Sequence, residues 1–421
     1  LYGPPMSAKP TVISLYTGAG GLDYGFEAAG FQTSVAVEMD RDACITLRHN
    51  RPRLPVIEDD IHNVSSDQIL ARASLARGQA DVLIGGPPCQ PFSKSAYWAA
   101  GDAARLSDPR SDTLGAYMRV VEDTLPKAFL LENVGAMKFD GKNEGVDLLL
   151  SLIDDINRRQ GVKYAAEFRV LKAADFGVPQ LRERFFLVAQ RDGQRFTFPT
   201  PTHSPVDATS GQLTLAHEPY RTAWDALHDV QPDDDERASL APRGKWAELL
   251  PSIKEGHNYL WHTSRGGGEP LFGWRTRYWN FLLKLAKGQP AWTLQAQPGP
   301  ATGPFHWESR RLSRRELCRL QTFPDSVHVV GNVAAVQRQV GNAVPSLLAE
   351  VIARSVWAQL LGRGAKRGAL KLLPPRQEHI PSPESLAPVP KRFLTMRGDH
   401  EDHPGTGKGN RARERWASVM A

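Results

Sequence analysis

The sequence predicts an α/β protein with a doubly wound, Rossmann-like sheet and a second, smaller domain. Short apolar runs alternate with amphipathic stretches through the first half of the chain, which is the pattern of consecutive βαβ units. The pattern breaks after residue 192, where a segment rich in Pro, Gly and Trp begins, and helical spacing returns near residue 344. These observations predict a sheet domain that is interrupted by an insert and completed after it.

Five runs are predicted to be strands because they are short, apolar or β-branched, and bounded by turn residues. They are Val12–Leu15, Ser34–Val37, Val82–Ile84, Phe129–Leu131 and Phe185–Val188. The spacing of apolar residues in Asp147–Arg158 predicts a helix. Because the carboxyl ends of parallel strands share one edge of a sheet, the residues that follow these runs are expected to line one cleft.

Composition sets the domain boundaries. Seven of the ten tryptophans fall between Trp224 and Trp307, so the insert is expected to have its own small core. Pro345 suits the first turn of the helix that follows it, and the Pro-rich chain beyond Gly362 lacks apolar residues for a core. The predicted divisions are residues 6–192 and 328–362 for the sheet domain, 193–327 for the small domain, and 363–421 for a basic, flexible tail.

The charge and the cysteines limit the classes of function. The net charge is +6, and the chain from Leu361 onward carries 12 Lys and Arg against 6 Asp and Glu, so the body is neutral overall. Nucleic-acid binding must therefore rest on local clusters. Three widely spaced cysteines indicate a reducing, cytoplasmic setting without disulfides. No metal site is expected, because neither CxxC nor HExxH occurs, and no membrane span, because no run reaches about 18 apolar residues.

A glycine-rich loop, Thr17–Gly25, directly follows the first predicted strand. Glycines there allow a sharp turn and a close approach of the backbone to a ligand, next to a helix N-terminus. Glu38 ends the second strand, 20 residues beyond Gly18, where an acidic side chain in this fold binds a ribose. A tight turn without a ligand is the alternative.

A second loop, Gly85–Ser93, follows the third strand and contains Cys89 between prolines. Such a stiff, polar loop at a strand end is typical of a nucleophile rather than of the small buried hydrophobe that most lone cysteines are.

Charged residues also follow or begin two later strands. Glu132 comes after the fourth strand and is expected to point into the same cleft as Cys89, unless it is a helix cap or a surface acid. Arg182 and Arg184 alternate onto one face of the next strand, so both are expected to reach one anionic or carbonyl-bearing ligand. The alternative is an exposed edge with ion pairs.

These motifs, in this order from about Val12 to Ile352, resemble those of the C5-cytosine DNA methyltransferase family. The resemblance also includes Arg311–Glu316, Leu320–Asp325 and Gly341–Pro345. It implies an S-adenosylmethionine-dependent DNA (cytosine-5-)-methyltransferase. Cys89 would add to C6 of a flipped-out cytosine, Glu132 would hold or protonate N3, Arg182 would brace the base carbonyl, and Arg184 would order the site around Cys89.

The resemblance also implies where S-adenosylmethionine binds. Glu38 would take the ribose, Met39 would pack on the adenine, and Asp60 and Ile61 would read the edge of the adenine. One departure is Tyr16, where the family often has Phe, so its hydroxyl needs a partner. The other implied cofactor residues are Gly18, Gly20, Gly21, Gly86, Pro88, Leu114, Asn342, Ala343 and Val344.

The insert then resembles a target-recognition domain for duplex DNA, although most of its aromatics are expected to form its own core. Arg310, Arg311, Arg314, Arg315 and Arg319 form a basic cluster that is expected to divide between a phosphate-facing side and a solvated face. The enzyme is expected to act as a monomer on DNA, associated with the nucleoid, in a restriction-modification or another anti-phage system.

Three other functions share features with a DNA methyltransferase. A zinc cytidine deaminase is excluded because Phe92 stands where the second cysteine of Pro-Cys-x-x-Cys would be. A transfer-RNA methyltransferase of the same family stays open, but the insert of about 115 residues, Gly193 to Trp307, favours duplex DNA. A catalytically silent DNA-binding paralogue also stays open, although the glycine loop, the cysteine and Glu-Asn-Val are all present.

Overall fold

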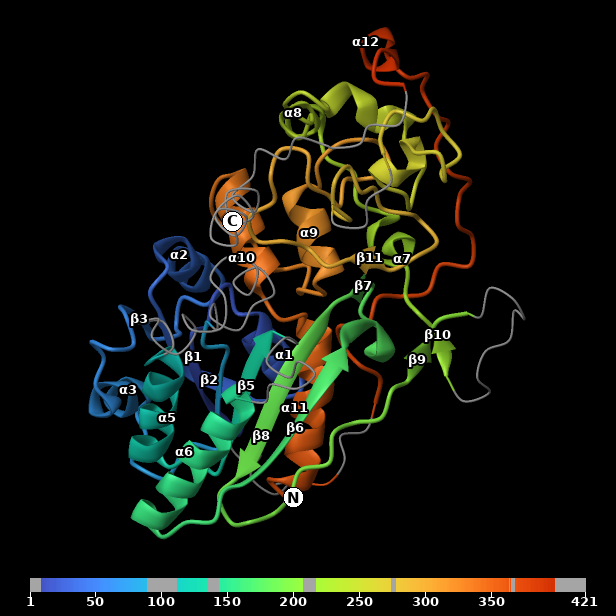
Figure 1. The fold of residues 1–421 in the computed structure, drawn as a ribbon. Coiled ribbons are helices and arrows are strands. Elements are labelled where there is room, and N and C mark those ends of the chain that lie inside the picture. The colour runs from blue at the N-terminus through green and yellow to red at the C-terminus, as the bar shows by residue number, and fades with distance from the viewer. Residues whose placement is uncertain are drawn as a thin grey trace, which may run out of the picture.

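The computed structural model describes residues 9–88, 112–134, 144–206, 217–273, 278–362, 364 and 368–397. Figure 1 shows a sheet with helices on both faces below a less regular upper part that carries α7, α8 and α9. The strands are β1 Thr11–Leu15, β2 Gln32–Glu38, β3 Val56–Glu58, β4 Val82–Gly85, β5 Ala128–Val134, β6 Ala165–Lys172, β7 Gln180–Leu181, β8 Glu183–Gln190, β9 His203–Ser204, β10 Glu218–Pro219 and β11 Ala291–Trp292. The helices are α1 Gly21–Ala28, α2 Arg41–Asn50, α3 Ser66–Ala73, α5 Asp112–Thr124, α6 Glu144–Gln160, α7 Ala223–Leu227, α8 Asp234–Ser239, α9 Arg314–Leu320, α10 Val333–Asn342, α11 Ser346–Gln359 and α12 Lys391–Leu394.

The central sheet of the described chain has seven strands in the order β3-β2-β1-β4-β5-β8-β6. The first five are mutually parallel, and β1 lies between β2 and β4. The chain therefore winds outward in one direction from β1 and in the other from β4, as a doubly wound sheet does. The predicted α/β fold is confirmed, and all five predicted strand runs lie in strands of this sheet.

Strand β8 departs from the predicted parallel pattern, whereas β6 runs in the same direction as β5. Strand β8 is antiparallel to both β5 and β6. Only the short stretch between Lys172 and Glu183 joins β6 to β8. A parallel connection needs a crossover of a dozen or more residues, so a link this short forces the two strands to run in opposite directions.

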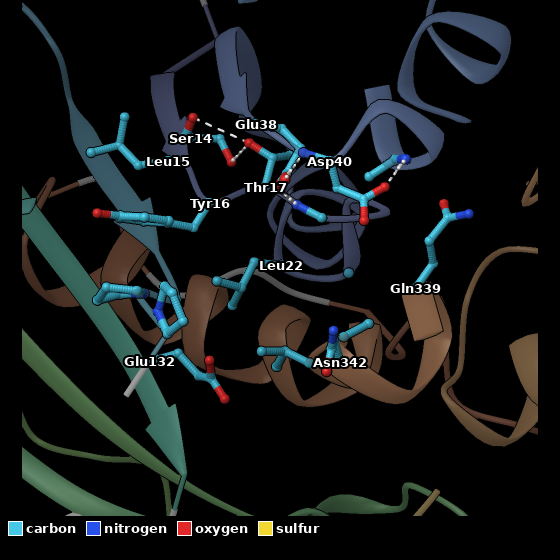
Figure 2. A pocket seen from close by; sticks show the side chains of 18 of the residues that line it. Ser14, Leu15, Tyr16, Thr17, Leu22, Glu38, Asp40, Glu132, Gln339 and Asn342 are labelled. Atoms are coloured by element: carbon cyan, nitrogen blue, oxygen red, sulfur yellow. Dashed lines mark hydrogen bonds between the residues drawn. The ribbon is translucent and has the colours of Figure 1, made fainter. Parts of the chain in front are cut away.

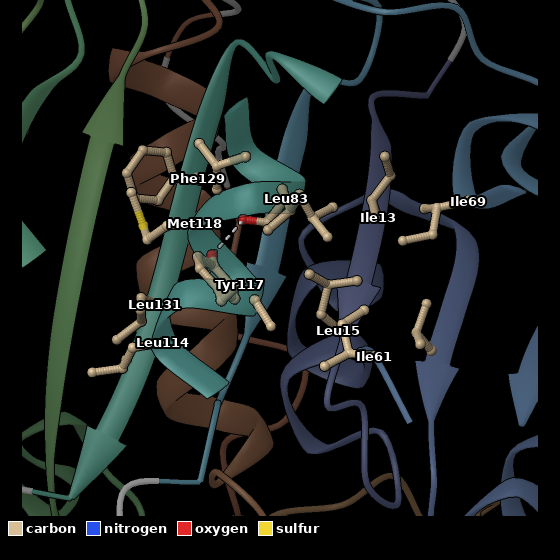
Figure 3. Close-up of a cluster of buried hydrophobic side chains, with 14 of the residues drawn as sticks. Ile13, Leu15, Ile61, Ile69, Leu83, Leu114, Tyr117, Met118, Phe129 and Leu131 are labelled. Atoms are coloured by element: carbon tan, nitrogen blue, oxygen red, sulfur yellow. Dashed lines mark hydrogen bonds between the residues drawn. The ribbon is translucent and has the colours of Figure 1, made fainter. Parts of the chain in front are cut away.

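One apolar core fills the space between the sheet and α3, α5 and α6 (Figure 3). Ile13 and Leu83 from neighbouring parallel strands are fully buried in it, as is Phe129. Tyr117 of α5 is also buried, and its hydroxyl donates to Leu130 O at 2.8 Å, so the one polar atom of this ring is paired. This core therefore holds β1, β4 and β5 together in one layer.

The opposite face of the sheet is covered by α1 and α11, which belong to the two ends of the sheet domain. Helix α11 begins directly after Pro345, one residue later than the predicted first-turn position of that proline. A Cβ atom on Gly25 would lie 2.4 Å from Ala349 Cβ, so only glycine lets α1 and α11 pack this closely. The contact brings residues 342–344 next to the loop after β1.

The residues between 217 and 331, here called the small lobe, contain little regular structure and two apolar clusters. One cluster includes Trp307 of the small lobe together with Tyr24 of α1, so it joins the small lobe to the sheet. The other lies farther out and holds Leu250, Phe272 and Phe305, with Trp246 packed against it. Most of these aromatics thus form the core of the small lobe, as expected.

The chain beyond Gly362 was predicted to be flexible, and for residues 368–397, here called the strap, that prediction is wrong. The amides of Lys371 and Leu372 donate to the buried carboxylate of Glu350 on α11 at 2.9 and 3.0 Å. At its other end, Phe393 is 3% exposed in the outer cluster of the small lobe. Figure 1 shows the strap running in orange and red along the edge from α11 to α12.

Polar contacts also attach the strap to the small lobe. The Lys287 ammonium lies 2.7 Å from Glu255 and 2.9 Å from Glu384 of the strap. The Trp224 indole donates to His379 O at 3.0 Å. A Pro-rich segment without a periodic pattern is therefore ordered by side chains and backbone groups of the surface it crosses.

Candidate active site

A cavity of about 390 Å³ lies at the carboxyl ends of the parallel strands. It is lined by residues at and after the ends of β1, β2 and β4, by β5 and β8, and by α10 with its link to α11. Strands β1 and β4 are neighbours at the point where the winding of the sheet reverses, which is where open α/β sheets bind ligands. The volume falls within the range of small-molecule sites.

The loop after β1 is shaped by its glycines and held by Glu38. Gly18 and Gly20 have φ angles of 55° and 89°, in the left-handed region that glycine adopts without strain. The Glu38 carboxylate accepts the Gly18 amide through Oε2 and the Asp40 amide through Oε1, both at 2.7 Å. Burial raises the pKa of Glu38. Each carboxylate oxygen can accept a second hydrogen bond, which suits a ligand that carries two adjacent hydroxyls.

Aromatic and apolar side chains complete the wall of the cavity (Figure 2). The hydroxyl of Tyr16 donates to Thr113 O at 2.9 Å, so the departure from Phe at this position has a partner. Thr113 Oγ1 also donates to Pro88 O at 2.9 Å and thereby ties Pro88, three residues after β4, to α5. Met39 is 65% exposed although it lines the cavity, so its flexible apolar side chain is available to cover a flat ligand ring.

A carboxylate and a guanidinium form an ion pair at the side of the cavity that β5 and β8 provide. Glu132 Oε1 lies 2.8 Å from Arg184 Nε, and Glu132 is 8% exposed. A Cβ atom on Gly86 would lie 2.6 Å from Glu132 Oε2, so the glycine makes room for the carboxylate. Burial raises the pKa of Glu132 despite the opposing charges of Arg184 and Arg182. The pair can therefore present either a carboxylate or a proton donor to a ligand in the cavity.

Comparison with known proteins decides the family. The model of the family described as C-5 cytosine-specific DNA methylase matches residues 10–358. The chain belongs to this family. The Type II methyltransferase M.SacI of Streptomyces achromogenes is 38% identical over 377 residues, which cover 84% of this chain and 94% of that relative. The Type II methyltransferase M1.HphI of Haemophilus parahaemolyticus is 33% identical, over 82% of this chain and 86% of its own. The chain is accordingly a DNA (cytosine-5-)-methyltransferase.

Solved structures support the same fold. A putative DNA modification methyltransferase encoded within an E. coli prophage aligns with a TM-score of 0.56 at 22% identity, over 84% of this chain and all of that one. A mutant DNMT2 of Spodoptera frugiperda aligns with a TM-score of 0.55 at 15% identity, over 83% of this chain and 100% of its own. At these identities the likeness shows the architecture alone.

Of the two arginines of the methyltransferase motif, only Arg184 lines the cavity, although both were expected to reach one ligand. Arg184 lines the cavity beside Glu132, whereas Arg182 does not line it and is 1% exposed. The Arg182 guanidinium donates to Leu294 O at 3.1 Å and to Gly341 O at 2.7 Å. Arg182 stands between β7 and β8, so the strict alternation of a single strand does not apply to it. It joins the small lobe to the residue that precedes Asn342, Ala343 and Val344 of the cavity wall.

The structure brings most of the predicted site residues together. Of the predicted set, those that line the cavity are Tyr16, Gly18, Gly21, Glu38, Met39, Gly86, Pro88, Glu132, Arg184, Asn342, Ala343 and Val344. Gly20 does not line the cavity; a Cβ atom on it would lie 3.2 Å from the Arg51 guanidinium. Ile61 and Leu114 belong to the apolar core, and the Asp60 carboxylate accepts the His62 amide at 3.0 Å. Cys89 lies outside the described residues.

Sequence reasoning missed Arg338, which lines the cavity from α10. Its guanidinium lies 2.9 Å from Asp40 and 2.8 Å from Asp42, the cap and first turn of α2. The ion pair thus joins the two sides of the cavity rim. Arg338 stands four residues before Asn342, on the same helix face, and that spacing was the available signal.

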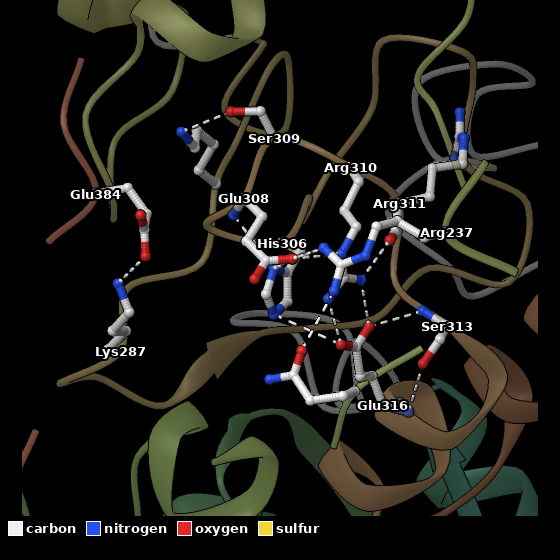
Figure 4. A network of polar contacts seen from close by, with 12 residues as sticks. Arg237, Lys287, His306, Glu308, Ser309, Arg310, Arg311, Ser313, Glu316 and Glu384 are labelled. Carbon is white, nitrogen blue, oxygen red and sulfur yellow. Dashed lines mark hydrogen bonds and ion pairs between the residues drawn. The ribbon is translucent and has the colours of Figure 1, made fainter. Parts of the chain in front are cut away.

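The basic cluster of residues 310–319 is mainly structural (Figure 4). Arg310 is 5% exposed and donates to both oxygens of the fully buried Glu316 at 2.7 and 2.8 Å. Arg319 bonds Asp229, and Arg314 bonds His328 and Gly331 O. Arg315 is the more accessible one, with a side chain that is 59% exposed. The expected phosphate-facing side therefore does not include Arg310.

The described residues offer neither a metal site nor a membrane span. Within the described ranges, no group of three or more His, Cys, Asp or Glu side chains is placed to hold a metal ion. The helices in the same part of the chain are all too short or too polar to cross a membrane.

Proposed function

We propose that this enzyme transfers a methyl group from S-adenosylmethionine to C5 of a cytosine flipped out of a specific duplex DNA sequence, through a covalent bond between Cys89 and C6. The observation that carries the proposal is the Glu132–Arg184 pair, 2.8 Å apart at the inner wall of the cavity. A raised carboxyl pKa beside a fixed guanidinium suits a ring that presents a nitrogen and a carbonyl side by side, as cytosine does.

The cavity fits S-adenosylmethionine by the chemistry of its donors. Glu38 keeps one free acceptor site on each oxygen for the two ribose hydroxyls. Tyr16 and Met39 supply apolar surface for the adenine, and the helix N-terminus after Gly20 favours the carboxylate of the methionine moiety. When bound, the cofactor supplies an electrophilic methyl group on a cationic sulfur.

The chain's own groups supply the rest of the chemistry. The Cys89 thiolate adds to C6 of the cytosine while Glu132 holds a proton at N3, and C5 becomes an enamine carbon that can take the methyl group. A base, such as a water molecule, then removes the C5 proton. The Cys89–C6 bond breaks, and the thiolate returns. Arg184, rather than Arg182, braces the base carbonyl and keeps Glu132 in place.

The cytosine must leave the base stack to reach Glu132 and Arg184, because these side chains lie in the cavity at the carboxyl ends of the strands and a stacked base cannot enter it. The small lobe is proposed to read the DNA sequence. The enzyme is proposed to work as a monomer on DNA in the cytoplasm, in a restriction-modification or another anti-phage system, as the type II methyltransferases among its relatives suggest.

Transfer of a labelled methyl group tests the proposal. Duplex DNA should accept the label and transfer RNA should not, and bisulfite sequencing of a host genome that expresses the enzyme should show one methylated sequence. Glu132→Gln should lower kcat by about 100-fold or more, because the amide cannot deliver a proton to N3. Label on transfer RNA alone would refute the DNA assignment, and near-normal turnover by Glu132→Gln would refute the role of the acid.

A further inference from the structure

Two tryptophans of the small lobe form an aromatic pair at the surface, in which Trp279 is exposed and Trp292 is partly buried. The Trp279 and Trp292 ring centroids are 5.3 Å apart with an angle of 69° between the planes, an edge-to-face contact. Trp279 is 43% exposed, whereas Trp307 of the same lobe is 4% exposed. Two neighbouring indole rings at the surface offer a flat apolar area, and such aromatic groups are enriched in binding sites.

Hydrogen bonds on both sides hold the backbone that carries the pair. Trp292 lies in β11, whose residue Ala291 donates to Pro179 O at 2.9 Å, and Thr293 Oγ1 donates to Leu181 O at 2.7 Å. On the other side, the Asn258 amide donates to Trp279 O at 2.7 Å. The backbone positions of the two rings are thus fixed relative to β7 and to Asn258.

The pair is close to the catalytic wall along the chain. Trp292 pairs with Leu181 of β7, and Arg184 follows Leu181 by three residues. Figure 1 shows β11 beside β7 at the end of the sheet that faces the small lobe. At about 3.3 Å per strand residue, Arg184 lies at most roughly 10 Å along the backbone from Leu181, and Trp292 lies about 4.8 Å across from Leu181. The backbone at Trp292 is therefore within reach of about three to four stacked nucleotides of one strand from the catalytic wall.

We propose that Trp279 and Trp292 contact DNA bases within about three nucleotides of the target cytosine, and that one of the rings stacks on a base face that the departure of the cytosine exposes. This inference rests on the proposed function, because only an extruded cytosine leaves such a face open. An indole ring can stack on any base, so the contact supports extrusion without reading the sequence by itself.

A cycle of protein variants and abasic DNA tests the inference. The variants are Trp279→Ala, Trp292→Ala and the two Phe replacements, which keep a ring. The ligands are duplexes that carry the target sequence found by methylation sequencing, each with one abasic position one to four nucleotides from the cytosine. Dissociation constants are measured with the demethylated cofactor present, so that no turnover occurs. Leu386→Ala, at a residue that is 46% exposed on the strap, is the control.

On intact duplex, loss of the stacking ring should weaken binding by about 5- to 150-fold, and Phe should restore most of the affinity. On the duplex that lacks the stacked base, the same Ala variant should bind as the wild type does. Affinities of both Ala variants within twofold of wild type, or losses of equal size at every abasic position, would overturn the inference. Failure of the wild-type enzyme to methylate duplex DNA would instead overturn the proposed function, whereas methylation with unchanged affinities of the Ala variants would overturn this inference alone.

Discussion

The strap offers the sharpest test of how the molecule is held together. We expect Phe393→Ala to destabilise the small lobe, because Phe393 is 3% exposed and stacks on Trp246, with ring centroids 5.8 Å apart and planes 16° apart. Truncation of a buried phenylalanine costs about 3–5 kcal/mol. Part of this cost is avoided if the end of the strap detaches, so we expect a loss of about 3 kcal/mol.

Thermal unfolding measures this loss. For a cooperative unit of about 150–250 residues, about 3 kcal/mol corresponds to a fall of roughly 6–12 °C in Tm. Limited proteolysis should at the same time cut the strap more rapidly. Leu386→Ala changes a residue of the same strap that is 46% exposed, and it should shift Tm by less than about 2 °C. If Phe393→Ala has the same Tm as the wild type, the strap is not a structural element, and the expectation of a flexible tail was correct.

Three further outcomes are expected. Arg182→Met should leave the carbonyls of Leu294 and Gly341 unpaired and lower Tm by several degrees, with a raised KM for the cofactor; an unchanged KM would show that Arg182 does not position the cavity wall. Glu38→Gln can accept only one of its two backbone amides, so calorimetry should show cofactor affinity about 10- to 100-fold lower with DNA affinity unchanged, and equal cofactor affinity would contradict the ribose assignment. Burial lowers the pKa of Lys284 from 10.5 to about 8, so the folded chain releases this proton before the unfolded chain does. The wild type should therefore gain up to about 3 kcal/mol over Lys284→Met between about pH 8 and 10.5, and a difference that stays flat with pH would refute the shift.

The sequence predicted β1, β2, β4, β5 and β8 because each contains a short apolar run bounded by turn residues, but it did not predict β3 and β6. It also predicted Glu38, Glu132 and Arg184 at the cavity, because those side chains follow or begin strands whose ends meet at one edge. Strand β6 is mostly half-buried and mixes charged with apolar residues, so no apolar run indicated it or its antiparallel pairing with β8.

Other features could not be predicted from local patterns. The strap has no apolar periodicity, and its few apolar side chains find partners far away in the sequence, as Phe393 does with Trp246. Arg310 belongs to an arginine-rich run that resembles a phosphate site. Its burial depends on Glu316 and Glu308, which flank it and neutralise it. The predicted domain boundaries and the role of Cys89 stay predictions.

The central claim is that the Cys89 sulfur bonds to C6 of the target cytosine, and trapping with 5-fluorocytosine tests it most directly. Fluorine at C5 cannot leave as the proton does, so the adduct should persist after methyl transfer and should map to Cys89 by mass spectrometry. Cys89→Ser should form no adduct and turn over far more slowly, because a hydroxyl is a weaker nucleophile, while Cys44→Ser and Cys318→Ser should still be trapped. An adduct on another residue, or near-normal methylation by Cys89→Ser, would contradict the mechanism.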